Sequence, residues 1–600
     1  MNKLSQRSAS PVGGPHSFRR VVLSFHLCGS LLIFLSAAQG QQNPASDNLT
    51  GEFLYNGIRL PAVWPPVIDP ALAKTPQPPP YLTNRPAVVP IDVGRQLFVD
   101  DFLIAETTLT REFHQAVNHE GNPVLSPETA WELGRTRQPM AAPFSDGAFH
   151  DPRTGRFQLW YMAGWFDGTA LATSKDGLRW ERLSQDIVPG TNLVVKADPL
   201  WRRDGVSVWL DHDARDPAER YKMFLYARSG NLGEKLDGAP GGTLHASPDG
   251  IHWTLRGTTG RTGDNTTFFY NPFRKKWVFS HRTNHELEGE RARTRGYTED
   301  GDFYAAIGDT WKKTPPVFWA RSDEADRPDP AGKNIRPQLY KIDAVAYESV
   351  MLGLFEVLYG PHNGTCAQGG FPKITELQVA FSRDGFHWDR QQRKPFIAAT
   401  RQAGDWDRAY ITSTGGCCLI VGDRLHFYYG AFQGDETNKA VNLKPGMDVW
   451  TGMYAKAATG LATLRRDGFA SMNADAKGTL TTVPVTFQGS HLFVNVDAPQ
   501  GSLQSEILDE AGRAIAPFTR ENSSPIQADS TRQRLQWKGA ADLSALRGKK
   551  VRFRFHLTSG RLYAFWVSPD ATGASHGYVA AGGPGFTGAT DTAGNLAAQP

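Results

Sequence analysis

Acidic side chains recur at one position in the middle of this sequence. Asp204 and Asp264 each stand seven residues before a polar turn position, in the near-copies Asp204-x-x-Ser-x-Trp-Leu-Asp211 and Asp264-x-x-Thr-x-Phe-Tyr-Asn271. Similar offsets give Asp146 and Glu348 in neighbouring segments. If these carboxyl groups meet in one pocket, one can protonate a leaving oxygen while a second acts as nucleophile or base, which is the chemistry that cleaves a glycosidic bond.

These carboxyl groups can be given separate roles. Asp146 or Asp204 is the candidate base or nucleophile, Glu348 the candidate acid, and Asp264 the group that tunes the site by like-charge repulsion. The alternative for each is structural, because an Asp at the start of a strand often caps a turn.

Other side chains could bind the hydroxyl groups or rings of a sugar. The candidates, drawn from loops and strand ends, are Arg137, Trp165, His281, Arg282, His362, Lys373 and Glu376. Three alternatives remain open. His281 and Arg282 could be a surface pair. Glu376 could have a structural role in the strand that follows it, and the tryptophans could pack between sheets.

The elements that would position these residues are marked by a repeated turn. The pattern S-x-D-G-x-x-W occurs at Ser174–Trp180, Ser247–Trp253 and Ser382–Trp388. Asp467-Gly468 is a partial copy, and Ser322-Asp323 is a degenerate copy in the remaining gap. The five Asp residues lie 73, 74, 61 and 83 residues apart.

Each copy predicts a β-hairpin, because Asp bonds to nearby backbone N–H groups and Gly accepts positive φ. Hairpins repeated at this spacing, with four strands to a unit, are typical of a β-propeller, and five copies predict five blades. The alternative is a set of ordinary hairpins in an all-β protein. The first strands of the blades are predicted around residues 149–151, 208–212, 268–272, 351–354 and 418–421, and an early strand at 97–99 could close the ring.

The regions that flank the propeller differ from it in composition. Period-two alternation at Val483/Val485/Phe487, Leu492/Val494/Val496 and Val551/Phe553/Phe555 predicts a β-sandwich. We therefore expect an all-β chain whose parts are a signal peptide (1–40), a Pro-rich N-terminal arm (41–94), a five-bladed β-propeller (95–473), a C-terminal β-sandwich (474–570) and a disordered tail (571–600).

The N-terminus has the pattern of an export signal. Arg19-Arg20 precede the apolar run Val21–Leu35, and small residues follow. Its removal would take away four basic residues and no acidic ones, leaving 61 of each. A net charge near zero argues against a nucleic-acid or membrane partner and fits a neutral one such as a carbohydrate. We expect a secreted or periplasmic protein, most simply a monomer.

Cys366, Cys417 and Cys418 remain after the leader. A bridge from Cys366 to one of the adjacent pair is the preferred expectation, and three reduced, buried thiols are the alternative. No zinc-binding pattern is present, so no metal or other cofactor is expected, although a calcium ion on the propeller axis would be compatible with the fold.

Several phrases resemble those of a group of secreted bacterial proteins, common in planctomycetes, that are described as glycosyl hydrolase-like. They include Arg95–Asp101, Asn122–Leu125, Ser382–Trp388 and Leu461–Phe469. The predicted architecture resembles glycoside hydrolase family 32, and the propeller alone resembles family 43.

The resemblance implies a five-bladed propeller and a glycosidase of unspecified substrate. The family 32 nucleophile segment W-x-N-D-P-N-G is replaced here by Ala142–Phe149, and the E-C segment that carries the acid of that family is missing, so specificity for fructosides is not implied. Two rival functions remain, a non-catalytic glycan-binding propeller and a surface scaffold.

Overall fold

The computed structural model describes residues 50–134, 138–197, 201–229, 241–260, 262–367, 372–435 and 452–594. The chain divides into two units, Met1–Asp47 and Asn48–Pro600, and every described residue lies in the second. Strands dominate this part, and its helices have at most five residues, so the prediction of a mainly β protein is confirmed. The predicted signal peptide lies outside the described residues. None of the described helices is long and apolar enough to cross a membrane.

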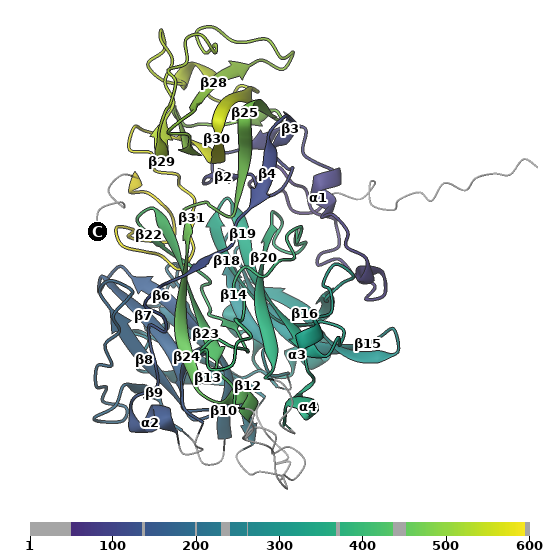
Figure 1. The fold of residues 1–600 in the computed structure, drawn as a ribbon, viewed down its shortest axis with the longest axis vertical. Helices are drawn as coiled ribbons and strands as arrows, with labels where there is room; N and C mark the ends of the chain where they lie inside the picture. Colours follow the sequence, from purple (N-terminus) through teal and green to yellow (C-terminus); the bar gives the residue numbers. More distant parts are fainter. Residues whose placement is uncertain are drawn as a thin grey trace, which may run out of the picture. The chain divides into compact units, whose positions relative to one another are not determined.

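Five runs of three or four antiparallel strands, here called units, follow one another along the chain (Figure 1). The first and the last are joined into one nine-stranded sheet by the parallel pairing of Met140 and Ala141 with Ala457 and Ala458. The first three contain β6 (Met140–Asp151), β7 (Arg156–Ala163), β8 (Gly168–Ser174) and β9 (Leu193–Val195); β10 (Trp201–Leu210), β11 (Tyr221–Ser229), β12 (Gly242–Ser247) and β13 (Thr254–Thr258); and β14 (Thr267–Asn271), β15 (Lys276–Leu287), β16 (Glu290–Asp300) and β17 (Val317–Ala320). The last two contain β18 (Gln338–Glu348), β19 (Val350–Gly360) and β20 (Ile374–Ser382); and β21 (Thr412–Ser413), β22 (Leu419–Val421), β23 (Arg424–Phe432) and β24 (Ala457–Arg465).

The first strands of these units contact one another in a closed series. β6 contacts β10, β10 contacts β14, and β14 contacts β18. Lys341 of β18 donates to Thr412 of β21 at 2.8 Å, and β21 in turn contacts β6. The starts of the five first strands are thereby brought together, which positions the site described below.

The three full copies of the repeated turn join their units to the unit before. In the three full copies the glycine N–H donates to the serine hydroxyl at 2.9 Å, and the Asp carboxylate accepts the next backbone N–H groups. An aromatic side chain of the preceding unit then donates to the turn backbone. The donors are Tyr428 to Gly177, Trp160 to Gly250 and Trp319 to Phe386, at 2.5, 2.8 and 2.8 Å.

The third unit carries its turn at a different place from the one predicted. Asp300-Gly301 follows β16 directly, and Asp300 accepts the N–H of Asp302 at 3.0 Å. The residues Thr298–Tyr304 thus keep the D-G and replace Ser and Trp by Thr and Tyr. Asp323 follows β17 and instead pairs with Arg393 at 2.8 Å, so its assignment as the degenerate copy is wrong.

The first strand of the fourth unit was also misplaced. Residues 351–354 belong to β19, the second strand, while β18 comes first. Both strands are buried along their whole length, and their apolar runs are therefore hard to tell apart by pattern.

A second, eight-stranded sheet is built mainly from C-terminal residues (Figure 1). Its strands are β25 (Ala470–Thr482), β27 (His491–Asp497), β28 (Ser502–Leu508), β29 (Asp529–Arg534) and β30 (Arg552–Ser568), with β2 (Gln96–Leu97), β3 (Ile104–Thr107) and β4 (Thr110–Phe113). The alternating residues Val494 and Phe553 are buried in its core, as their spacing predicts. The division of this sheet into two layers stays a prediction.

N-terminal residues complete both parts of the fold. The predicted strand at 97–99 was expected to close the ring, but β2 pairs with β30. The fifth unit is completed instead by β5 (Val117–Asn118), which pairs with β24. In the Pro-rich arm, Leu54 and Ile58 are buried in the core of the eight-stranded sheet, so the arm packs through its apolar side chains.

Residues 571–594 are not a disordered tail. In β31 (Tyr578–Val579), Val579 pairs with Tyr347 of β18, and Trp566 donates to the carbonyl of Gly573 at 3.0 Å. Because this segment is fixed by backbone pairing and by specific polar contacts, its low content of large apolar residues misled the prediction.

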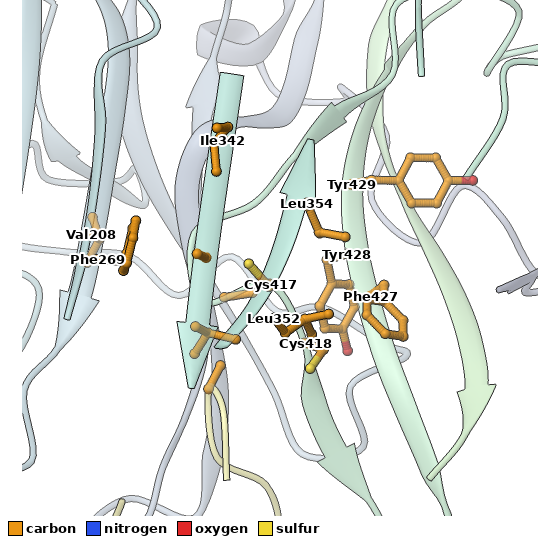
Figure 2. Packing of buried hydrophobic residues seen from close by; sticks show 14 of the residues in the cluster. Val208, Phe269, Ile342, Leu352, Leu354, Cys417, Cys418, Phe427, Tyr428 and Tyr429 are labelled. Atoms are coloured by element: carbon orange, nitrogen blue, oxygen red, sulfur yellow. The ribbon is translucent and has the colours of Figure 1, made fainter. Parts of the chain in front are cut away.

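The preferred disulfide bridge is also wrong. Cys366, Cys417 and Cys418 are all free and buried. Figure 2 shows Cys417 and Cys418 among apolar side chains such as Leu352, and burial raises the pKa of both thiols. The three cysteines therefore agree with the alternative expectation of reduced, buried thiols.

The turn packing can be tested by two glycine substitutions. Gly250 has φ +79°, and a Cβ there would lie 2.5 Å from a ring carbon of Trp160, whereas Gly190 has φ +83° with open space around it. We expect Gly190→Ala to cost about 1 kcal/mol for the left-handed backbone and Gly250→Ala to cost about 1–3 kcal/mol more through overpacking. Denaturant unfolding measures both, and equal losses would contradict the packing role.

Candidate functional site

A cavity of about 230 Å³ lies where the first strands begin. Every unit contributes to it from its first strand or the residues just before it. These contributions are Phe144 of β6, Asp204 of β10, Asp264 and Asn265 before β14, Tyr340 of β18 and Tyr410 before β21. The ends of second strands and the starts of third strands add Trp165, Phe166, Arg228, Arg282, Arg293, Asn363, Lys373 and Tyr454.

Asp204 and Asp264 form one polar cluster. The guanidinium of Arg228 contacts both carboxylates, and Arg282 contacts the other oxygen of Asp264. The Asp204 side chain is 3% exposed and that of Asp264 is 21% exposed. The repeat spacing therefore brings together two of the four predicted carboxylates.

The surroundings move the pKa values of this pair in opposite directions. Burial raises the pKa of Asp204, and the charge of Asp264 adds to the rise against the opposing effect of Arg228. Burial also acts upward on the pKa of Asp264, but Arg228, Arg282 and Arg293 outweigh it and hold that pKa below its ordinary value. Such a divergence favours the protonated form at Asp204 relative to Asp264.

Lys373 is buried at the cavity among tyrosines. Its Nζ lies 4.3 Å from the ring centre of Tyr340, 4.2 Å from that of Tyr410 and 5.2 Å from that of Tyr454. Burial acts to lower the pKa of Lys373, but Tyr340 and Tyr454 more than offset it, so the pKa is raised. The ammonium therefore stays charged.

Trp165 lines the cavity but offers little ring surface. It is 1% exposed and stacks on Phe166 and Tyr454, with ring centres 4.3 and 4.4 Å away. A ligand can meet only the small part of the indole left uncovered. Arg282 and Lys373, also predicted, both line the cavity.

Asp146 lies apart from the cavity lining. It is buried, pairs with Arg203 at 2.9 Å and accepts the Phe144 N–H at 2.6 Å. Since its oxygens are engaged by Arg203 and the strand backbone, the structural alternative describes it better than the catalytic one.

The remaining predicted binding residues fall outside the lining. His281 is buried against Trp311 and Thr298, and burial lowers its pKa to about 3. His362 is exposed, while its neighbour Asn363 lines the cavity. Glu376 is buried and contacts Arg401 and the N–H of Ala399. Arg137 lies outside the described residues.

Glu348 is far from the cavity. It is the last residue of β18, whereas Tyr340 near the start of that strand lines the cavity. Eight residues of strand span about 26 Å. The offset that selected Glu348 was counted for a first strand at 351–354, and the error in the strand produced the error in the residue.

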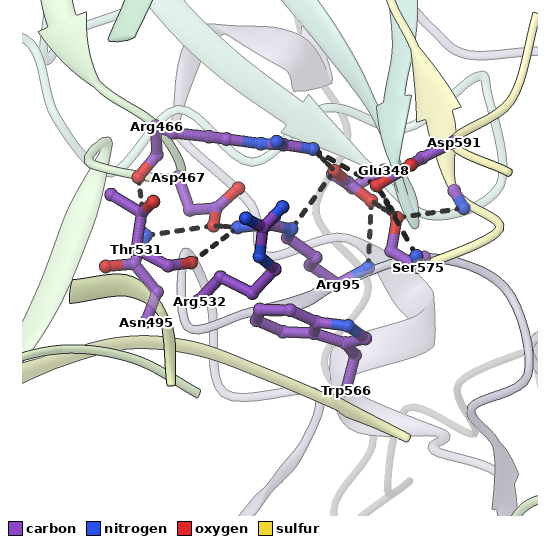
Figure 3. Close-up of polar contacts among 12 residues, drawn as sticks. Arg95, Glu348, Arg466, Asp467, Asn495, Thr531, Arg532, Trp566, Ser575 and Asp591 are labelled. Atoms are coloured by element: carbon purple, nitrogen blue, oxygen red, sulfur yellow. Dashed lines mark hydrogen bonds and ion pairs between the residues drawn. The ribbon is translucent and has the colours of Figure 1, made fainter. Parts of the chain in front are cut away.

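Glu348 instead joins the units to the rest of the fold (Figure 3). Its carboxylate lies 3.1 Å from Arg466 and 3.4 Å from Arg95, and it accepts the Ser575 hydroxyl at 2.7 Å. Arg95 also pairs with Asp467 at 2.8 Å and lies over the Trp566 ring at 4.1 Å. Burial of this fully enclosed carboxyl raises its pKa against the effect of both arginines.

Arg228, Arg293 and the three tyrosines were not predicted. One signal was available for Arg228, because Arg228 and Arg282 stand at similar distances from the starts of the second strands, as the eighth residue of β11 and the seventh of β15. Arg293 lies near the start of the third strand β16, opposite Asn284 of β15, where no repeated residue marks it. Among the described residues, no group of three or more His, Cys, Asp or Glu could hold a metal ion.

No family model matches the sequence, and no curated protein matches it. Among solved structures, an N-acetylgalactosamine deacetylase from F. plautii in complex with blood group B trisaccharide is similar at a TM-score of 0.36 and 15% identity, over 58% of this chain and 97% of that one. An exo-β-1,3-galactanase from Phanerochaete chrysosporium with galactose has a TM-score of 0.31 and 10% identity, over 75% and 99%.

A fructofuranosidase from Schwanniomyces occidentalis complexed with fructosylnystose has a TM-score of 0.34 and 10% identity, over 76% and 96%. All three of these proteins are carbohydrate-active enzymes by name. Because the TM-scores lie below 0.5, the chemistry of this site has to follow from its own residues.

The structural role of Glu348 predicts a large loss of stability on substitution. Glu348→Gln removes the charge that faces Arg95 and Arg466, and we expect a loss on the order of 3 kcal/mol. Chemical unfolding measures it, with the exposed Glu120→Gln as a matched control. Unchanged stability of Glu348→Gln would contradict this role.

Proposed function

We propose that the five units are the blades of a five-bladed β-propeller, and that the cavity at the starts of their first strands is a carbohydrate site where a glycosidic bond is hydrolysed. The observation that carries this proposal is the Asp204–Asp264 pair, which shares one guanidinium while its pKa values move apart. A neighbouring acid and base are what glycoside hydrolysis requires.

Each member of the pair has one role. Asp204, protonated through burial, donates its proton to the glycosidic oxygen as the bond from that oxygen to the anomeric carbon breaks. Asp264, ionised, either takes a proton from the attacking water or attacks the anomeric carbon itself. Arg228 contacts both and is the positioning residue that fixes their separation.

A second candidate is carbohydrate binding without cleavage. One observation favours it, because Arg228 and Arg282 already occupy oxygens of both carboxylates. Carboxylates held in this way can serve as fixed hydrogen-bond acceptors for sugar hydroxyls. The two candidates differ in whether a bound glycan is cut.

The remaining features of the protein fit such a role. We propose that residues 1–40 direct export, that the protein acts outside the cytoplasm as a monomer, and that the eight-stranded sheet is the C-terminal β-sandwich of a family 32-like architecture. Export would bring the cavity to polymeric carbohydrate outside the cell.

Substitution of the two carboxylates tests the hydrolase. On a panel of plant and algal glycans, Asp204→Asn and Asp264→Asn should each lower the rate of cleavage by about 10²–10⁴-fold, measured as released reducing ends. The exposed Asp475→Asn is the matched control and should cut as the wild type does. Full activity in both cavity variants would refute the mechanism. Binding of a glycan that is never cut would establish the second candidate.

The pH dependence of cleavage tests the assignment of acid and base. Asp264 must be ionised and its pKa lies below 3.8, so the rate should fall only when the pH drops below that value. Asp204 must be protonated and its pKa lies above 3.8, so the rate should fall again as the pH rises through that higher pKa. Over the range in which the protein stays folded, kcat/KM should follow a bell with its maximum in acid. A rate that rises steadily through neutral pH would exclude Asp204 as the acid.

A further inference from the structure

Among the described residues that line the cavity, positive side chains outnumber negative ones. The lining holds the cations Arg228, Arg282, Arg293 and Lys373 and the carboxylates Asp204 and Asp264. The two carboxylates contact Arg228 and Arg282. Among the described residues, Arg293 and Lys373 lie within 4.0 Å of no carboxylate, so the surplus charge of the cavity belongs to these two.

Lys373 is the more deeply buried of the two cations. Lys373 is 1% exposed, and its Nζ donates to the Tyr454 hydroxyl at 3.4 Å. A buried ammonium is costly unless it is paired or bonded. The faces of Tyr340, Tyr410 and Tyr454 supply only part of that compensation through cation–π contacts, so a counter-anion at this place would be strongly favoured.

Arg293 lies near the same place. Its guanidinium is 4.7 Å from the ring centre of Tyr340, the ring that Lys373 approaches at 4.3 Å. The positive charge of Arg293 acts to lower the pKa of Lys373 and the pKa of Asp264. One donor position of Arg293 is taken by Gln338 at 2.9 Å, which leaves further N–H groups of its five for a ligand.

We propose that this cavity recognises the anionic group of an acidic sugar, a carboxylate or a sulfate ester, with Lys373 and Arg293 as the two cations that attract it. The inference rests on the carbohydrate site proposed above and names its substrate class. It also revises the expectation of a neutral ligand, because the balance of charge over the whole chain does not describe this cavity.

The preference for acidic over neutral sugars follows from the Lys373 ammonium, which has no carboxylate partner within the described part of the chain. An acidic sugar gives Lys373 a charge-assisted hydrogen bond in a place from which water is largely excluded. A neutral sugar of the same shape would bury the ammonium further and give it no counter-charge. The free-energy cost of that desolvation weakens the binding of neutral sugars only.

Calorimetric titration of the full chain tests the proposal. The ligands are glucuronate and galactose 6-sulfate, their neutral counterparts glucose and galactose, and inorganic sulfate and acetate as free anions. The variants are Lys373→Met, Lys373→Arg and Arg293→Gln, with the exposed Lys312→Met as the matched control. A thermal unfolding scan of each variant verifies that it folds.

We expect acidic sugars to bind at least tenfold more tightly than neutral ones. Lys373→Met should lose that tenfold preference, Arg293→Gln should lose part of it, and Lys373→Arg and Lys312→Met should retain it. If Lys373→Met fails to fold, the comparison rests on Lys373→Arg and Arg293→Gln, and unchanged binding of acidic sugars by Arg293→Gln then counts against the proposal.

Each other result overturns the inference in a different way. Equal binding of acidic and neutral sugars overturns the acidic substrate class and leaves the carbohydrate site standing. Free sulfate or acetate that binds as tightly as the acidic sugars shows an anion site without sugar recognition. Binding of none of the sugars removes the proposed function and this inference together.

Discussion

The fold depends on the contacts between the three full copies of the repeated turn and aromatic side chains of the preceding units. Trp160 donates to the backbone of Gly250, and Tyr428 does the same for Gly177 across the closure between the last and first units. Glycine is required at these turns because a Cβ at Gly250 or Gly177 would lie within 2.6 Å of the aromatic partner. These contacts set the units side by side and bring the starts of their first strands to a common place.

The protein compensates its buried charges in two different ways. Around Glu348, Arg95 and Arg466 pair with three carboxylates, which include Asp467 and Asp591, and Arg532 adds a third positive charge nearby. That arrangement holds the units, the eight-stranded sheet and the C-terminal segment together (Figure 3). Among the described residues of the cavity, in contrast, cations are left over. A cluster whose charges pair with one another stabilises the fold, whereas a cluster with unpaired cations can bind an anionic ligand.

Part of the site could be predicted because the repeat is local in sequence. The turn pattern located β10 and β14, and a fixed offset from their turns found Asp204 and Asp264, which do meet. The same reasoning failed at Glu348 because two buried apolar strands, β18 and β19, cannot be ordered from hydrophobicity alone. It failed at Asp323 because the third unit has a shorter path to its turn, at Asp300.

By itself the sequence determined the β class, the turns and the two carboxylates, since each follows from residue types within a few positions of one another. Only the tertiary structure decided that Arg228, Arg293, Lys373 and Tyr410 surround those carboxylates. Their places depend on hairpin lengths and strand register, which differ from unit to unit. The partners that link distant segments, such as Arg95 with Glu348 or β5 with β24, are equally invisible in a local pattern, because they form only when the ring closes.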